Sequence, residues 1–288
     1  MTTNSNKYDR RRKYYMVLDC ETATLPCAMN YEGGDRQKIA IAKPLIYDLG
    51  WQVIDRQGRV YAQKHFLISE IFSVPSIFNT AYYASKRPYY IEMLKDGKIT
   101  LVDWNTASAE MLADIEYCEA VGAYNSMFDF KKAIPFTELY INKLYSNDFY
   151  EWEKEQNKFC ELLVFGRENN NKRDFDGDNF IFRNKKYPLF DLWSLSCEHL
   201  LNNDDYKRMC IDEKWTTTSG KYFKTSAETA YRFISGNLEF DEAHTALEDV
   251  IIESKLFAEI VKKKISNLTI GIEYFPFRIL GTVENFNY

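Results

Sequence analysis

The feature that most constrains this chain is an apolar run that ends in two acids, Tyr-Tyr-Met-Val-Leu-Asp-Cys-Glu-Thr over residues 14–22. Its aromatic and branched residues are typical of a strand buried in the middle of a sheet. Because successive side chains of a strand alternate between its faces, Asp19 and Glu21 would project to the same side. Two carboxylates delivered to one point are costly unless cations neutralise them. The run therefore predicts a cation site; the alternative is a strand end whose acids lie in solvent.

Composition narrows the class of protein. The chain has 288 residues, 45% of them hydrophobic and 16% aromatic, which is typical of a globular protein with one large or two small domains. Its six cysteines form no C-x-x-C pair and its three histidines are scattered, which argues against a zinc site or a disulfide framework and favours reduced thiols in a cytosol. No apolar run has transmembrane length, and the first residues lack the apolar core of a signal peptide. We expect a cytoplasmic protein with no membrane partner.

The chain divides into an arm, a domain and a tail. Residues 1–13 form a polar, basic N-terminal arm, either a solvated charge run or a contact for nucleic acid. Residues 14–265 are expected to form one α/β domain with insertions at about 70–105 and 146–187. The apolar, β-prone residues 266–288 are expected to pack back on the domain, with an interface role as the weaker option. The net charge of −5 argues against indiscriminate binding of polyanions but allows a local basic path.

Local patterns predict the elements of this domain. Strands are expected at 45–54 and 59–69, joined by the turn Asp55-Arg56-Gln57-Gly58, and at 120–124. Short helices are expected within 72–103, and a plain turn rather than a calcium loop is expected at Asp174 to Asp178. One helix is expected from a cap at Asn105 or Thr106 to residue 119, and another from a cap at Asn125-Ser126 to a kink or end at Pro135. The remaining helices are expected at 148–165, at 192–200 after Asp191, at 227–234 after Ser226, and at 243–264.

Acidic residues occur at three separate positions along the chain that could meet in one site. Asp19 and Glu21 end the first strand, Asp129 lies on the first turn of a helix, and Asp249 lies on the last helix, five residues after His244. Carboxylates that converge repel one another unless hard cations lie between them, and oxygen ligands select Mg²⁺ or Mn²⁺. Two such ions about 3.5–4 Å apart suit in-line phosphodiester displacement. A neutral histidine beside the attacking water would supply the general base.

Three short segments carry a resemblance to a known family. They are, in chain order, Asp19-x-Glu21-Thr22, Tyr124-Asn125-Ser126-Met127-Phe128-Asp129 and His244-x-Ala246-x-x-Asp249. In order and rough spacing they resemble the three motifs of the DnaQ-like, DEDDh-type 3′–5′ exonucleases, with phage-encoded members the most similar. Phe190-Asp191-Leu192 and Ala227-Glu228-Thr229-Ala230 resemble the linking segments of that family. The resemblance spans about Tyr14 to Glu259.

The resemblance implies a fold and a set of site residues. The fold would be RNase H-like, a mixed central sheet flanked by helices. Two Mg²⁺ or Mn²⁺ ions would be held by four acids, namely Asp19, Glu21, Asp129 and Asp249, and His244 would be the general base. Thr22 would meet the terminal nucleotide through its backbone, and Asn125 would lie near the scissile bond.

The implied function is hydrolysis of single-stranded DNA from a free 3′ end, with release of nucleoside 5′-monophosphates. A polymerase or another replication protein could be a partner, and a phage-encoded enzyme would act in the cytoplasm of its bacterial host. Two alternatives stay open: a 3′–5′ exonuclease of RNA or short oligoribonucleotides, and a catalytically idle nucleic-acid-binding or polymerase-accessory module.

Several of these residues also have purely structural interpretations. Asp129 could be an acid that the helix dipole favours, and His244 a capped histidine with satisfied hydrogen bonds. Asp191 is expected to be a helix cap rather than a metal ligand. His65 and His199 are expected to be structural, and Trp51, Trp104 and Trp193 are expected in the core. Coincidence is a poor explanation for the acids and His244 taken together.

Overall fold

The structure is a computed structural model that describes residues 8–9, 11–26, 43–146, 179–265, 268 and 275–286. Its framework is a mixed sheet of seven strands in the order β4-β3-β2-β1-β5-β7-β6. The central strand β1 (Tyr14–Ala23) pairs antiparallel with β2 (Leu45–Asp55) and parallel with β5 (Cys118–Ala123). The outer strands are β3 (Val60–Ile68), β4 (Thr100–Val102), β6 (Asn179–Phe182) and β7 (Lys185–Asp191).

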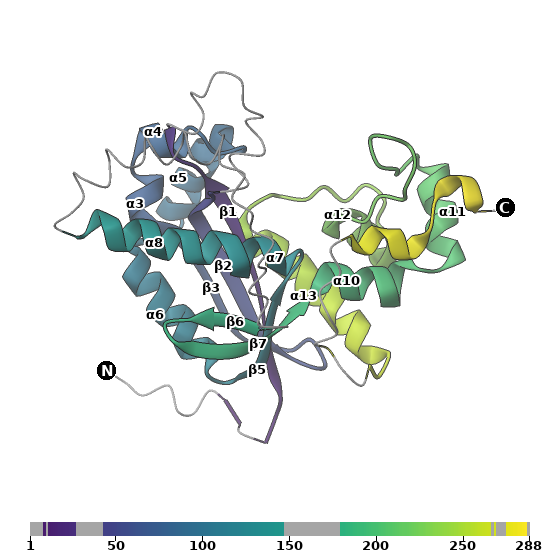
Figure 1. Cartoon of the computed structure of the whole chain (residues 1–288), viewed down its shortest axis with the longest axis horizontal. Coiled ribbons are helices and arrows are strands. Elements are labelled where there is room, and N and C mark those ends of the chain that lie inside the picture. Colours follow the sequence, from purple (N-terminus) through teal and green to yellow (C-terminus); the bar gives the residue numbers. More distant parts are fainter. Residues whose placement is uncertain are drawn as a thin grey trace, which may run out of the picture.

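Helices cover both faces of this sheet, as the expected α/β architecture requires (Figure 1). Alternate residues of β1 belong to different core clusters: Tyr14, Met16 and Leu18 to one, and Tyr15 and Val17 to the other. The strand is therefore buried on both sides, which explains its unbroken apolar sequence.

The first cluster lies under helices from the first half of the chain. They are α3 (Ser69–Phe72), α4 (Pro75–Phe78), the 3₁₀ turn η1 (Ala84–Lys86), α5 (Arg87–Lys95), α6 (Trp104–Ile115), α7 (Ser126–Phe128), the π turn η2 (Asp129–Ala133) and α8 (Ile134–Leu144). Trp51 and Trp104 are fully buried in this cluster.

The second cluster is built by the C-terminal helices. They are α10 (Leu192–Ser196), the π turn η3 (Cys197–Leu201), α11 (Asp204–Asp212), α12 (Ala227–Ser235), the long α13 (Ala246–Lys262) and the 3₁₀ turns η4 (Pro276–Leu280) and η5 (Val283–Asn285). The ring of Tyr15 on β1 contacts Phe257 on α13 at 5.1 Å between centroids. Trp193 is only partly buried here.

Several expected elements agree with the structure. The hairpin of β2 and β3 is antiparallel and turns through residues 55–58. Asp191 accepts a hydrogen bond from the Ser194 backbone at the start of α10, and Ser226 accepts one from the Thr229 backbone at the start of α12. Each cap satisfies a backbone donor that the first turn of a helix leaves open.

Other boundaries were wrong. Asp103, not Asn105 or Thr106, caps α6, which ends at Ile115 because Cys118 already belongs to β5. Of the kink or end expected at Pro135, the end is wrong: Pro135 lies in the first turn of α8, where proline is tolerated, and the helical segment is irregular just before it, at the π turn η2. Residues 185–187, placed in the second insertion, belong to β7 of the central sheet.

The arm and the tail are described only in part. In the arm, Tyr8 is buried, its hydroxyl donates to Asp114 at 2.6 Å, and its ring stacks on Tyr117. In the tail, expected to be β-prone, the described residues form two 3₁₀ turns, with Leu280 buried in the second cluster. The helix expected at 148–165 and the turn expected at 174–178 lie outside the described residues.

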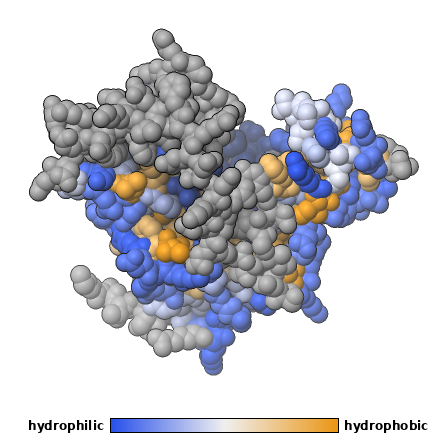
Figure 2. All heavy atoms as spheres, viewed as in Figure 1, coloured by the Kyte–Doolittle hydropathy of each residue, from blue (hydrophilic) through white to orange (hydrophobic). Residues whose placement is uncertain are grey.

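The described surface seen in Figure 2 is mostly hydrophilic, with hydrophobic residues in a few smaller patches. Within the described ranges, no helix combines the length and the apolar character needed to cross a bilayer.

Candidate active site

The site forms where parallel strands end together. Because β1, β5 and β7 run parallel, their carboxyl ends meet at one edge of the sheet. Asp19 and Glu21 lie near the end of β1 and follow the alternation of Tyr15 and Val17, so they face α13. The register with β2 shifts just after Glu21, so that Glu21 pairs with Asp48 but the next residue, Thr22, pairs with Ile46.

The amino end of α13 packs directly on β2. A Cβ atom on Gly50 would lie 2.5 Å from the backbone nitrogen of Leu247, so only glycine permits this approach. Gly50 pairs with Asp19 across the two strands. The close contact therefore brings the first turns of α13 over the carboxylates of β1.

Asp48 fixes the start of α13. It lies opposite Glu21 in the sheet and is completely buried. Its carboxylate accepts hydrogen bonds from His65 Nε2 at 2.8 Å, from the Tyr90 hydroxyl at 2.8 Å and from the backbone nitrogen of Ala246 at 3.0 Å. His65 thus has the structural role expected of it. An acid on β2 supplies the cap that the first turn of α13 needs.

Three of the expected site residues come together at this point. Side-chain ligand atoms of Glu21, His244 and Asp249 all lie within 4.8 Å of one another. His244 was expected inside the last helix, but α13 begins only at Ala246. His244 precedes it with φ of 50°, a left-handed turn, and its backbone nitrogen donates to Asp249 Oδ1 at 3.2 Å. This turn folds the imidazole back toward the acids.

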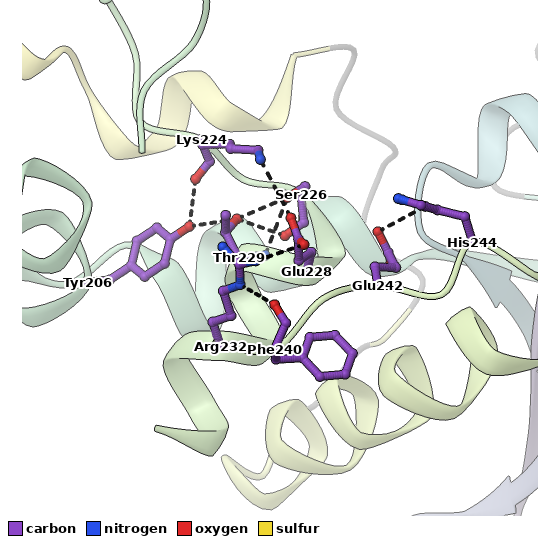
Figure 3. Close-up of polar contacts among 9 residues, drawn as sticks. All are labelled: Tyr206, Lys224, Ser226, Glu228, Thr229, Arg232, Phe240, Glu242 and His244. Carbon is purple, nitrogen blue, oxygen red and sulfur yellow. Dashed lines mark hydrogen bonds and ion pairs between the residues drawn. The ribbon is translucent and has the colours of Figure 1, made fainter. Parts of the chain in front are cut away.

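His244 has neighbours on both sides of its side chain. Its ring stacks on Tyr83 at 4.6 Å between centroids, and Lys86 donates a hydrogen bond to the carbonyl of neighbouring Ala243. Both come from the segment expected to be an insertion. On the other side, Glu242 Oε2 lies 3.6 Å from His244 Nδ1 (Figure 3). Burial and the nearby Lys86 charge lower the pKa of His244, which favours the neutral ring that a general base requires.

Glu242 belongs to a further group of charges beside the histidine. Burial and the charge of Glu228 raise the pKa of Glu242 to about 7. Glu228 lies on α12, where it is paired with Arg232 at 3.0 Å and with Lys224 at 3.6 Å (Figure 3). His244 thus lies beside Glu242, and the neighbouring Glu228 carries two basic partners.

Asp129 and Asp19 form a second part of the site. Asp129 is buried at the start of η2, and its Oδ1 accepts a hydrogen bond from Cys20 Sγ at 3.0 Å. It lies outside the group of Glu21, His244 and Asp249, yet its charge is among those that raise the pKa of Asp19. The expected acids therefore share one neighbourhood, but not all of their ligand atoms lie within one 4.8 Å group.

Burial dominates the electrostatics of these acids. It raises the pKa of Asp129 to about 7 and that of Asp249 to about 8, and it raises the pKa values of Asp19, Glu21 and Glu253 well above the usual range. The acids also repel one another, which adds to the effect for Asp19, Glu21 and Glu253. A site of this kind binds protons or cations, and its oxygen donors fit hard ions such as Mg²⁺ or Mn²⁺.

These pKa shifts predict that the metal-free protein loses stability as the pH rises. The folded-state pKa values of Asp129 and Asp249, about 7 and about 8, lie above the ordinary 3.8. Between those values the folded state binds more protons than the unfolded state, so the free energy of unfolding falls with rising pH. We expect the Tm of EDTA-treated protein to fall by several degrees from about pH 5 to about pH 8, and Mg²⁺ to reverse the loss. A metal-free Tm that rises over this range would contradict the electrostatics.

The two expected substrate-binding residues lie beside this site. Thr22 is partly exposed, and the chain after it is anchored because Thr80 exchanges two hydrogen bonds with the backbone of Thr24. Asn125 is exposed and has φ of 77°, a left-handed turn that asparagine tolerates. Its side chain caps no helix, contrary to expectation. The backbone nitrogen of Ser126 donates instead to Asp191, which confirms Asp191 as a cap.

We compared the chain with protein-family models, with curated proteins and with solved structures, and none of them matches it. The assignment of the site therefore depends on its own geometry and on the motif resemblance.

Sequence reasoning missed several residues of the site: Asp48, Glu253, Glu242, Tyr83 and Lys86. A signal existed for two of them, because Asp48 interrupts an apolar strand and Glu253 lies on the apolar face of a helix. The other three are brought in by loops and by the segment 70–105, and no local pattern marks them.

Proposed function

We propose that this chain is a metal-dependent 3′–5′ exonuclease that hydrolyses single-stranded DNA from a free 3′ end and releases nucleoside 5′-monophosphates. The supporting observation is the meeting of Glu21, His244 and Asp249 within 4.8 Å, with the buried Asp129 and the half-buried Asp19 beside them. A seven-stranded mixed sheet with helices on both faces is also the architecture expected of an RNase H-like fold, which we propose for this chain.

In this proposal each residue has a distinct task. The cations are held by four acids, namely Asp19, Glu21, Asp129 and Asp249. A site made of several carboxylates favours divalent ions over monovalent ones. Two divalent ions, when bound, would activate the attacking water and stabilise the leaving 3′ oxygen. His244 accepts the proton of that water. Glu242 lies on the Nδ1 side of the ring, so Nε2 is the nitrogen left to accept it.

The environment of the site suits a free nucleic-acid end. Thr22 and Asn125 lie beside the acids at the same edge of the sheet, where a terminal nucleotide would be held. We further propose a replication protein such as a polymerase as a partner, and the cytoplasm of the bacterial host as the compartment if the chain is phage-encoded.

The direction of digestion tests this function. A 3′-phosphate should block digestion of a single-stranded DNA oligonucleotide, because the proposed site would hold a free 3′ hydroxyl, whereas a 5′-phosphate should have no effect. The measurement is the rate of nucleotide release from matched oligonucleotides that differ only at one end. Circular single-stranded DNA, which lacks an end, serves as the control and should remain intact. Cutting of the circle as fast as the linear strand would show an endonuclease instead.

The same assay with a matched RNA oligonucleotide decides between DNA and RNA as substrate. Faster digestion of RNA would favour the oligoribonucleotide exonuclease, whereas binding of both strands without digestion would favour an idle binding module.

A further inference from the structure

One acid in the site has no assigned task. Glu253 lies on α13, one helical turn after Asp249, and residues four apart on a helix lie on the same face. Only 3% of Glu253 is exposed. It therefore lies deeper in the fold than Asp249 and projects from the same face of the helix.

The carboxylate of Glu253 is incompletely satisfied. The backbone of Tyr124 forms a hydrogen bond with it, but its Oε2 atom has no hydrogen-bond partner among the described residues. Burying a polar atom without a hydrogen-bond partner is destabilising, and more so if the group is charged. A cation beside Oε2 would remove that cost.

The neighbours of Glu253 are other acids of the site. Its charge is the one that most raises the pKa of Asp19, ahead of Asp129 and Asp249. In return, Asp129 is the charged group that most raises the pKa of Glu253. The backbone of Tyr124, which bonds Glu253, joins the end of β5 to the segment that carries Asp129. Glu253 therefore lies on the side of Asp19 and Asp129, next to the group formed by Glu21, His244 and Asp249.

We propose that Glu253 is a fifth metal-binding carboxylate, which acts with Asp19 and Asp129 on one cation while Asp249 and Glu21 act on the other. Helix α13 then contributes one acid to each ion, because its repeat places Asp249 and Glu253 one turn apart. This inference depends on the proposed two-metal function and adds to it a ligand that none of the three motifs contains.

Metal binding without turnover tests the role of Glu253. Calorimetric titration of metal-free protein with Mn²⁺, in the absence of nucleic acid, should show two ions bound to the wild type. Glu253→Gln keeps the shape but removes the charge, so one of the two affinities should fall about 10–100-fold, the range seen when groups that support metal ligands are lost. The control is Glu259→Gln on the same helix, whose side chain is 41% exposed and which should bind as the wild type does.

The possible results are distinct. Two ions bound to Glu253→Gln with wild-type affinity would overturn the role of Glu253 and leave the exonuclease proposal intact. A wild type that binds no Mn²⁺ would overturn both. Should Glu253→Gln fail to fold, Glu253→Asp keeps the charge but shortens the side chain; weaker binding of one ion supports the proposal, and unchanged binding overturns it.

Discussion

Asp249→Asn should reduce the rate of nucleotide release by about 10³-fold or more, because a metal-bound transition state loses several kcal/mol of stabilisation when a ligand charge is removed. A ligand atom of Asp249 lies within 4.8 Å of ligand atoms of both Glu21 and His244, so its charge acts directly on this group. The same substitution should weaken Mn²⁺ binding in a calorimetric titration. The two effects should occur together, since one carboxylate causes both.

The control for this substitution is again Glu259→Gln, which removes an acid from the same helix at an exposed position. It should retain wild-type turnover and metal affinity. Wild-type turnover by Asp249→Asn would contradict the assignment of Asp249 as a ligand.

His244→Ala should have a different signature. General-base catalysis is worth roughly 10²–10⁴-fold, so kcat should fall by that factor while KM changes little. Metal binding should be retained, because the four acids remain. The wild-type rate should rise with pH as the imidazole loses its proton. The midpoint of this rise should lie below the ordinary pKa of histidine, because burial and the charge of Lys86 lower the pKa of His244. The variant should lose that part of the pH profile.

His199→Ala provides the matched control, since His199 lies on η3 and is not a member of the site. It should keep both kcat and the pH profile. The ligand atoms of His244 lie close enough to Glu21 and Asp249 for a metal to reach them. Loss of metal binding in His244→Ala would therefore identify the histidine as a ligand, and an unchanged kcat would give it a structural role.

The parts of the fold that depend on local chemistry could be predicted from the sequence. The strand that carries Asp19 and Glu21, the hairpin that follows it, and the caps at Asp191 and Ser226 are all visible in short stretches of residues. Each depends on alternation, turn residues or a side chain that satisfies a backbone donor within three residues.

Features that depend on distant contacts could not be predicted in this way. The pattern of the last helix predicts a start near Ala243, but Asp48 binds the backbone nitrogen of Ala246, 198 residues away in sequence, and fixes the start there. The left-handed turn at His244 lies two residues before that contact. The stacking of Tyr83 on His244 likewise joins two segments that no local pattern relates.

The central claim is tested most directly by following a single-stranded DNA oligonucleotide labelled at its 3′-terminal nucleotide, with Mg²⁺, Mn²⁺, Ca²⁺ or excess EDTA present. The account predicts rapid release of the label as nucleoside 5′-monophosphate with Mg²⁺ or Mn²⁺, little release with Ca²⁺, and none with EDTA. Full activity in excess EDTA, or intact DNA with every ion, would contradict it.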